Sequence, residues 1–324
     1  MKRKIRCCFT DFWYGFDYKI YFGFLQPEYD LVIDDKNPDY LFYSCFGMNH
    51  LNYNNCIKIF WSGENIIPNL NLCDYAVSLS DMQCRDRTLR QSAALFWKPY
   101  SPDLNEEQLL NRKFCNFVYS NNQMADPARE RFFNLLSKYK RIDSGGEYLN
   151  NMGRRVADKH VFLKEYKFTI AIENSSVSGY STEKIYHPFL AQSLPIYWGC
   201  PNISSYYNTN SFVNIMDFSS FEEAVEEVIR LDNDDAAYLE KATAPFWPYG
   251  ESFEEFYHAE LERRLSFFRN IFEQPLETAR RRTEYGKMPL YYSQIKRAFL
   301  PPEQQLKEKY IRYLKGIVKK VIRK

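Results

Sequence analysis

Hydrophobic residues in the first third of the chain fall into short runs separated by polar breaks. The runs are KIRCCFTDFW (4–13), DLVI (30–33), DYLFYSCF (39–46), CIKIFW (56–61) and DYAVSLS (74–80). Apolar runs of this length, joined by longer connections, are typical of parallel strands linked by crossovers. The pattern therefore predicts a parallel sheet in this part of the chain.

Residues 114–231 alternate between strand-like and helix-like patterns. The predicted strands are 114–120, 141–146, 167–173, 194–199 and 211–215, and the predicted helices are 126–139, 160–166, 183–193 and 220–231. Strands and helices in alternation are typical of a doubly wound α/β domain. Two such halves facing each other across a cleft would be the economical architecture. We therefore predict domains at 1–112 and 113–270, followed by a helical basic tail at 271–324.

The tail segment EQQLKEKYIRYLKGIVKKVIRK (303–324) has apolar residues at helical spacing. They stand at 306, 310, 314, 317, 318 and 321, and Lys and Arg fill most positions between them. A basic amphipathic helix of this kind is typical of segments that lie in an anionic membrane interface. The alternative is a helix that packs on its own domain and leaves a solvated basic face.

The segment ENSSVSGYSTEKIYHPF (173–189) joins a predicted strand to a predicted helix. Ligands of open α/β sheets bind at the carboxyl ends of strands, and Gly179 lets backbone approach a ligand closely. Thr182 is a good N-cap, so the amides that follow it favour an anion such as a diphosphate. Lys184 adds positive charge there, and Glu183 suits the hydroxyl groups of a ribose or a sugar. The alternative is a capped helix with a surface Glu–Lys pair. Pro188 predicts a kink in this helix.

Composition narrows the class of protein. The formal charge is +2, from 43 basic and 41 acidic residues, which does not suit a nucleic-acid binder. The basic start has no signal-peptide pattern, and no run of about 18 apolar residues predicts a membrane span. Eight scattered cysteines without a CxxC pair indicate reduced structural thiols, so a cytoplasmic protein is expected. Four histidines without metal-ligand spacing argue against a zinc site.

Three longer stretches carry a family resemblance. They are YKFTIAIENSSVSGYSTEKIYHPFLAQSLPIYWGCPNI, FWSGENIIPNLNLCDYAVS and SFVNIMDFSSFEEAV, within about residues 57 to 231. They resemble the bacterial α1,3/4-fucosyltransferases of glycosyltransferase family 10. The resemblance implies a GT-B fold of two Rossmann-like domains, an inverting mechanism and GDP-fucose as donor. It also implies an N-acetyllactosamine-type oligosaccharide acceptor, fucosylated on the 3-OH or the 4-OH of N-acetylglucosamine.

The resemblance also assigns residues of the donor site. Its glutamate and lysine fall on Glu183 and Lys184, its loop tyrosine on Tyr180 and its post-strand asparagine on Asn174. Its helix arginine falls on Arg129, whose planar fork suits a pyrophosphate. Without the resemblance, Arg129 would be taken as a solvated helix residue, with Arg131 as a nearby decoy. Ser120 and Asn121, at the end of a predicted strand, resemble donor-side loop residues.

The family's general base falls on Glu64, in a loop that contains Gly63. A sugar hydroxyl is a poor nucleophile, so a carboxylate must take its proton as the new glycosidic bond forms. The alternative is a loop glutamate paired with a lysine. Acceptor contacts are expected from Asp11, Trp13 and Tyr14, although the two aromatic residues could equally belong to the core.

The resemblance implies that no cofactor is required and that divalent metal is at most stimulatory. No DxD metal-binding motif stands out, and DND (232–234) is interpreted as a loop. Bacterial members often end in basic tails, so peripheral attachment to the anionic inner-membrane surface is expected. Two alternatives remain: another GT-B nucleotide-sugar glycosyltransferase, or a non-catalytic glycan-binding protein.

Overall fold

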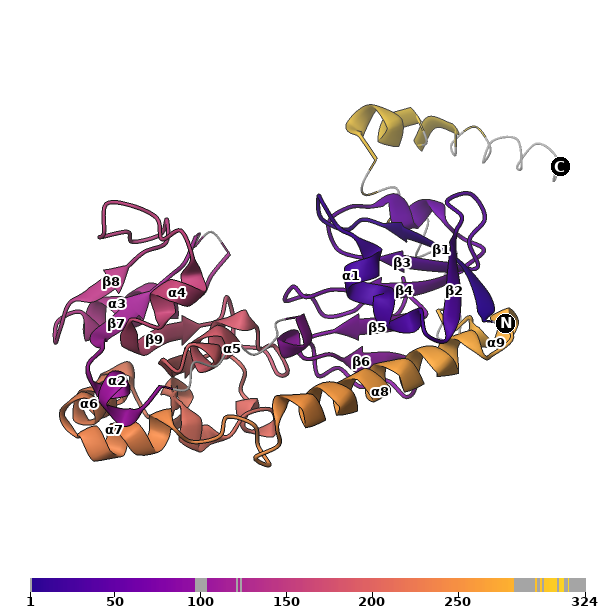
Figure 1. Cartoon of the computed structure of the whole chain (residues 1–324). Helices are drawn as coiled ribbons and strands as arrows, with labels where there is room; N and C mark the ends of the chain where they lie inside the picture. The colour runs from indigo at the N-terminus through magenta and orange to yellow at the C-terminus, as the bar shows by residue number, and fades with distance from the viewer. Residues whose placement is uncertain are drawn as a thin grey trace. The chain divides into compact units, whose positions relative to one another are not determined.

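The computed structural model describes residues 2–96, 104–120, 122 and 124–282, together with 295, 298, 300–307, 309–311 and 314 (Figure 1). Its chain forms two compact units. Unit 1 contains Met1–Trp61, Pro68–Ala76 and Arg269–Lys324, and unit 2 contains Ser62–Ile67 and Val77–Phe268. The predicted domain boundaries at residues 112 and 270 are a different division of the chain and stay a prediction.

The first sheet has six strands in the order β2-β1-β3-β4-β5-β6. They are β1 (Arg3–Thr10), β2 (Tyr29–Ile33), β3 (Tyr40–Tyr43), β4 (Ile57–Trp61), β5 (Tyr75–Ser78) and β6 (Thr88–Arg90). Strand β1 runs parallel to β2 and to β3, and β3 runs parallel to β4. The short helix α1 (Tyr18–Phe22) follows β1. The predicted parallel sheet in the first third of the chain is confirmed.

The second sheet has five strands in the order β11-β10-β9-β7-β8, and its pairs are parallel. The strands are β7 (Lys113–Phe117), β8 (Ile142–Ser144), β9 (Tyr166–Ile172), β10 (Leu194–Trp198) and β11 (Val213–Asn214). The helices of this part are α2 (Glu106–Leu110), α3 (Ala128–Leu136), α4 (Lys159–Leu163), α5 (Glu183–Leu190), α6 (Phe221–Asn233) and α7 (Asp235–Ala242). The predicted alternation of strands and helices is therefore confirmed.

Several predicted boundaries differ from the structure. Helix α3 begins at Ala128 with Pro127 as its N-cap, and the Asp126 side chain accepts a hydrogen bond from the Ala128 amide at 2.8 Å. Helix α5 continues through Pro188 to Leu190. The interpretation of 232–234 as a loop is wrong, since α6 includes Asn233 and Asp234 caps α7.

Both sheets follow one topological rule. When the strands of each sheet are numbered from one in chain order, the first five strands of both sheets lie in the order 2-1-3-4-5. The strand order therefore reverses between β1 and β3 in the first sheet and between β7 and β9 in the second. In open α/β sheets the crevice for a ligand lies at the carboxyl ends of the strands, at this reversal. In unit 2 the rule points to the residues that follow Phe117 and Ile172.

The last turn of α8 (Phe253–Phe272) and the described residues directly after it belong to unit 1. The guanidinium of Arg269 forms an ion pair with Glu28, and that of Arg282 forms one with the buried Asp74. Helix α9 (Leu276–Ala279) lies between these two arginines in the chain. The start of the predicted tail is therefore part of a folded unit, and most of the predicted amphipathic segment lies outside the described residues.

Side chains of the described tail residues Leu306, Tyr310, Ile311 and Leu314 are exposed. Over the part of the chain that the structure describes, no helix is both long and apolar enough to cross a bilayer. All eight cysteines are free thiols, and six of them are buried. The sequence prediction of reduced structural thiols agrees with this placement.

Candidate functional site

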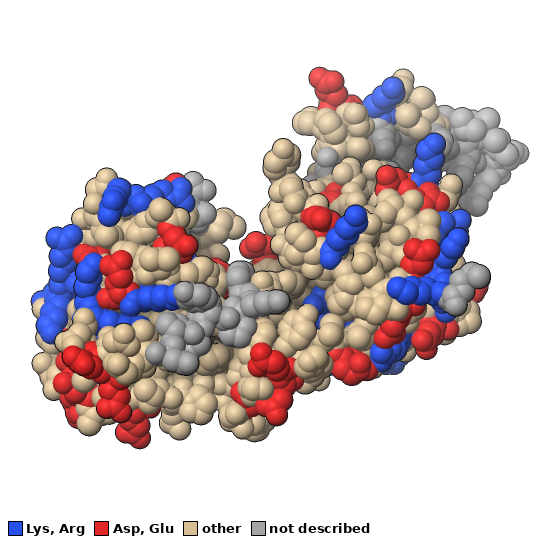
Figure 2. Space-filling model, viewed as in Figure 1, with Lys and Arg blue, Asp and Glu red and all other residues tan. Residues whose placement is uncertain are grey.

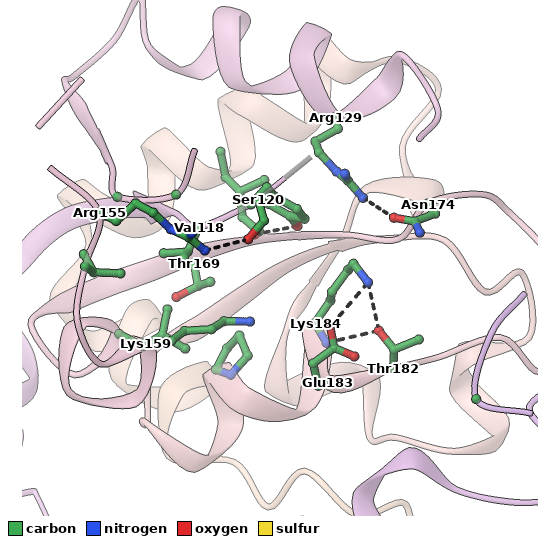
Figure 3. Close-up of a pocket in the computed structure, with 18 of the residues that line it drawn as sticks. Val118, Ser120, Arg129, Arg155, Lys159, Thr169, Asn174, Thr182, Glu183 and Lys184 are labelled. Atoms are coloured by element: carbon green, nitrogen blue, oxygen red, sulfur yellow. Dashed lines mark hydrogen bonds and ion pairs between the residues drawn. The ribbon is translucent and has the colours of Figure 1, made fainter. Parts of the chain in front are cut away.

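A cavity of about 500 Å³ lies within unit 2 at the carboxyl ends of β7 and β9 (Figure 3). Its volume falls in the range of ligand sites, about 300–1,000 Å³. The residues that line it and carry the argument below are Glu64, Tyr119, Ser120, Arg129, Arg155, Lys159, Asn174, Tyr180, Thr182, Glu183 and Lys184. The predicted donor residues of the described chain therefore converge on one cavity, at the predicted edge of the sheet.

One wall of the cavity rests on a buried carboxylate. Glu173 follows β9 and is fully buried, and its Oε1 accepts a hydrogen bond from the Thr182 amide at 2.7 Å. The Thr182 hydroxyl donates to Glu173 Oε2 at 2.8 Å, and Lys184 Nζ lies 3.4 Å from the same oxygen. Because Thr182 also caps α5, the carboxylate fixes both the start of the helix and its lysine.

Charges in the first turn of α5 are strongly coupled. Lys184 Nζ lies 3.4 Å from Glu183 Oε1. Burial acts to raise the pKa of Glu183, but Lys184 and Lys159 outweigh it and hold that pKa at about 2. Burial acts to lower the pKa of Lys184, but Glu173 and Glu183 raise it above its ordinary value. Both side chains are therefore charged at neutral pH.

Arg129 lies in the first turn of α3, with only 1% of its surface exposed. Its Nη2 donates to the Ile172 carbonyl at 3.1 Å and to Asn174 Oδ1 at 2.7 Å. The guanidinium also stacks over the Tyr119 ring, 4.0 Å from the centroid. The alternative of a solvated helix residue is wrong, and these bonds show the arginine holding the loop that follows β9.

Glu64 reaches the same cavity from the 62–67 segment. Its side chain is exposed, and its amide donates to Ser62 Oγ at 3.0 Å. The next residue, Asn65, donates its side-chain amide to Ser175 Oγ in the loop after β9. The sequence alternative of a lysine-paired glutamate has no support among the described residues, where Glu64 makes no ion pair.

The loop that carries Tyr180 is tightly held. Gly179 has φ +84°, and a Cβ there would lie 2.6 Å from Leu79 O and from Asp81 N. Arg90 clamps the loop, because its Nη2 donates to Gly179 O at 2.9 Å and to Ser181 Oγ at 3.1 Å. Tyr180 is 2% exposed, and burial raises its pKa, so its hydroxyl stays protonated. Glycine is required here by both φ and space.

Sequence reasoning missed two cations and a glycine pair. Lys159 and Arg155 line the cavity, and Arg155 Nη2 lies 3.4 Å from Ser120 Oγ while its Nη1 pairs with Glu147. A Cβ on Gly146 would lie 2.0 Å from the Tyr119 carbonyl oxygen, so only glycine fits. The Gly–Gly pair directly after a strand was a usable signal, whereas the two cations stand in a polar stretch without periodicity. Asn121, a predicted donor residue, lies outside the described residues.

Basic side chains gather over β8 on the face of unit 2 that Figure 2 shows, whereas acidic ones gather over α6 and α7. Within the described parts of the chain, no group of three or more His, Cys, Asp or Glu is arranged to hold a metal ion. Among the described residues that line the cavity, the positively charged side chains are those of lysine and arginine.

The predicted acceptor residues lie in unit 1. Asp11 is buried, with 7% of its surface exposed, and it accepts hydrogen bonds from the amides of Asn49 and His50 at 2.9 and 2.8 Å, so its predicted acceptor contact stays a prediction. Trp13 packs in an aromatic cluster, with its ring centroid 5.1 Å from that of Tyr21 and 5.9 Å from that of Trp61. Tyr14 is fully exposed, so the core alternative is wrong for this residue.

Two family matches cover most of the chain. Residues 7–97 match the alpha-(1,3)-fucosyltransferase FucT N-terminal domain, and residues 110–243 match the glycosyltransferase family 10 (fucosyltransferase) C-terminal domain. The chain belongs to glycosyltransferase family 10. The match to the FucT N-terminal domain begins at residue 7, well before residue 57, where the sequence resemblance was placed.

Among relatives in sequence, alpha-(1,3)-fucosyltransferase FucT of Helicobacter pylori is 33% identical over 227 residues, which are 59% of this chain and 47% of that protein. GDP-fucose protein O-fucosyltransferase 3 of Homo sapiens is 28% identical over 151 residues, 43% of this chain and 32% of that protein. The chain thus spans less than half the length of these curated relatives.

Solved structures support the fold of this family 10 chain. A crystal structure of an alpha1,3-fucosyltransferase matches with a TM-score of 0.72 at 28% identity, over 84% of this chain and 91% of that chain. A crystal structure of an alpha1,3-fucosyltransferase with GDP-fucose matches with a TM-score of 0.69 at 27% identity, over 85% and 92%. Together with the two parallel sheets, these matches confirm the GT-B class of fold with two Rossmann-like sheets.

Proposed function

We propose that the chain is an inverting fucosyltransferase. It transfers L-fucose from GDP-fucose to the 3-OH of N-acetylglucosamine in an N-acetyllactosamine-type glycan, with the 4-OH as the alternative position. The observation that carries the proposal is the cavity of unit 2. Glu64 lines this cavity together with Arg129, Lys159 and Lys184. The same cavity therefore contains a carboxylate and several cations. Single displacement at a sugar phosphate requires both, a base for the acceptor hydroxyl and positive charge for the leaving phosphate.

The reaction is a single displacement at the anomeric carbon of fucose. The acceptor hydroxyl oxygen forms the new bond to this carbon while the bond to the β-phosphate oxygen breaks, and the electron pair leaves with GDP. Glu64 takes the hydroxyl proton, which makes the oxygen nucleophilic as it attacks. Because the Glu64 side chain is exposed, an acceptor can reach its carboxylate directly.

Departure of GDP places new negative charge on its β-phosphate. Cationic side chains near this oxygen stabilise the charge, and each such interaction in a preorganised site contributes about 3–4 kcal/mol. Lys184 is held charged by Glu173 and Glu183, and Arg129 orders Asn174 at the same strand end. We propose on this basis that the reaction needs no metal ion, with divalent cations at most stimulatory.

The deciding assay incubates the purified chain with GDP-fucose and N-acetyllactosamine, with and without EDTA, and identifies the product linkage by NMR. We expect fucose on the N-acetylglucosamine residue and no loss of rate with EDTA. Transfer from a different nucleotide sugar would favour another GT-B glycosyltransferase. Glycan binding without turnover would favour a non-catalytic binding protein, and either result contradicts the proposal.

For location, we propose a cytoplasmic protein that attaches to an anionic inner-membrane surface through its basic tail. The exposed Leu306, Tyr310, Ile311 and Leu314 support an apolar face on this segment. The test is co-sedimentation of the full chain with vesicles of phosphatidylglycerol and, as the control, of phosphatidylcholine. Equal recovery with both kinds of vesicle, or with neither, would contradict attachment through charge.

A further inference from the structure

Cations outnumber carboxylates among the described residues that line the cavity. The positive side chains are Arg129, Arg155, Lys159 and Lys184, and the negative ones are Glu64 and Glu183. The four cations are not equivalent, because the protein already supplies oxygen partners to some of them. A cation without such a partner has all of its N–H groups available to an anionic ligand.

Three of the four cations are engaged by the protein. Arg129 donates to the Ile172 carbonyl and to Asn174, and it is 1% exposed. Lys184 lies 3.4 Å from oxygens of both Glu173 and Glu183, and Arg155 pairs with Glu147. The fold therefore holds these three groups in place through its own contacts before a ligand arrives.

Lys159 differs from the other three. It is the first residue of α4, and among the described residues its ammonium makes no hydrogen bond and no ion pair. Figure 3 shows its side chain extended into the cavity toward the end of α5 that carries Glu183 and Lys184. It is half-buried, so its ammonium has lost part of its water without gaining an oxygen from the protein.

We propose that Lys159 is a further cation that binds the diphosphate of the donor, beside Lys184 and Arg129, which the fold already holds in place. The proposal rests on the proposed function for the identity of the donor. A diphosphate supplies the several oxygen acceptors that this ammonium lacks, and a charge-assisted hydrogen bond is the stronger kind of polar contact.

The electrostatics of the cavity agree with this assignment. Burial lowers the pKa of Lys159, and Lys184 lowers it further, while Glu183 acts in the opposite direction. An ammonium in such surroundings is stabilised when an anion arrives, because the anion offsets both the lost water and the neighbouring positive charge. Glu183 makes no ion pair with it, so the lysine remains available to the ligand.

The experiment measures binding of GDP, GMP and guanosine to the full chain by calorimetry, for wild type and Lys159→Met. We expect GDP affinity to fall about ten- to a hundredfold, as for loss of one hydrogen bond to a charged group, while guanosine affinity stays the same. A fall for GDP alone indicates the β-phosphate, and a fall for both GDP and GMP indicates the α-phosphate. Either pattern supports the proposal.

Two matched variants control the measurement. Lys138→Met makes the same chemical change at an exposed lysine after α3 that does not line the cavity, and it should leave all three affinities unchanged. Lys159→Arg keeps the charge and should recover most of the GDP affinity. If Lys159→Met does not fold, Lys159→Gln is measured in its place with the same expectations.

An equal fall for all three ligands, or unchanged GDP affinity, overturns the proposal. A wild-type chain that binds GDP no better than guanosine overturns it too. Failure of the proposed function gives a different result: GDP binding would still depend on Lys159 while no fucose is transferred. Conversely, transfer with unchanged GDP affinity in Lys159→Met rejects the lysine and keeps the transferase.

Discussion

The two sheets share a strand order, yet the carboxylates at their strand ends are used differently. Asp11 follows β1, and Glu173 follows β9; both are buried and both accept hydrogen bonds from backbone amides of a later segment. The side-chain partner of Asp11 is His50, whose Nδ1 lies 2.7 Å from Asp11 Oδ2 and whose buried ring stacks on Tyr43. The partner of Glu173 is Lys184, which lines a cavity.

One topology therefore serves two purposes. In unit 1 the carboxylate ties the residue after β1 to the 49–50 segment through two backbone amides and the His50 ring. In unit 2 the carboxylate holds a lysine whose ammonium stays beside a space large enough for a ligand. The difference lies in the residue that contacts the carboxylate, which is His50 in unit 1 and Lys184 in unit 2. The variants below each change a residue of one unit or the other.

The largest effect is expected from Glu64→Ala. General base catalysis contributes about 10²- to 10⁴-fold, so kcat should fall by this factor while the Kd for GDP stays within twofold. Steady-state kinetics and calorimetry measure the two quantities. Glu240→Ala removes an exposed glutamate of α7 as the matched control and should leave both unchanged. A variant that keeps its kcat would show that the cavity of unit 2 does not use this base.

The second effect comes from Lys184→Ala, which leaves Glu173 buried and unpaired. Removal of one partner of a buried pair costs about 3–5 kcal/mol of unfolding free energy. The double variant Lys184→Ala/Glu173→Gln should recover a large part of this stability but none of the lost GDP affinity. Denaturant unfolding and calorimetry report the two separately. Recovery of both together would mean that Lys184 serves the fold alone, as His50 does in unit 1.

Gly179→Ala tests the loop that carries Tyr180. Its left-handed φ of +84° and the 2.6 Å approach to Leu79 O predict a loss of about 2–3 kcal/mol in unfolding free energy. Gly153→Ala is the matched control, because its φ is +72° and no atom lies within 4 Å of the added Cβ. It should cost about 1 kcal/mol. Equal losses in the two variants would show that the close approach contributes nothing.

Asp11→Asn changes the corresponding carboxylate of unit 1. Burial acts to raise the pKa of Asp11, but hydrogen bonds from His50 and Asn49 outweigh it and lower that pKa. The unfolded state therefore binds a proton more readily, so this contribution to stability is present above about pH 4 and is lost as pH falls through the lowered pKa. Asp11→Asn should cost about 1–2 kcal/mol at pH 7 and almost nothing in strong acid. A raised KM for the acceptor at unchanged stability would instead restore Asp11 as an acceptor contact.

Tyr14→Ala should have the smallest effect on the fold. The side chain is fully exposed, so unfolding free energy should change by less than about 0.5 kcal/mol. If the ring holds a sugar of the acceptor, the KM for N-acetyllactosamine rises a few-fold while the KM for GDP-fucose stays constant. An unchanged acceptor KM removes the last predicted aromatic contact that is available at the surface of unit 1.

Short-range patterns predicted the elements of this fold well, because apolar runs and caps are local properties. Thr182 caps α5 as expected, and the strand before it ends one residue ahead of Glu173. The burial of Asp11 was not predictable in this way, since its partners Asn49 and His50 stand almost forty positions further along the chain. The local pattern predicts where a strand ends, but it does not predict which distant segment packs over that end.

The candidate site shows the same limit. Residues with motif context, such as Lys184 and Arg129, were found, whereas Lys159 resembles any lysine of a polar connection until the fold brings it to the cavity. The burial of Arg129, with 1% of its surface exposed, was not predictable from the sequence, and its role at the pyrophosphate stays a prediction. The sequence identifies the charged residues, but tertiary packing determines which of them can contact a ligand.

A cysteine buried in each sheet can report when that sheet opens. Cys7 in β1 and Cys115 in β7 are at most 1% exposed, and burial raises the pKa of each, so neither reacts with iodoacetamide while its strand is covered. Pulsed alkylation followed by peptide mass spectrometry would time the opening of each half separately, without an added label. As nucleotide is added, alkylation of Cys115 should slow first, and alkylation of Cys7 should slow only later.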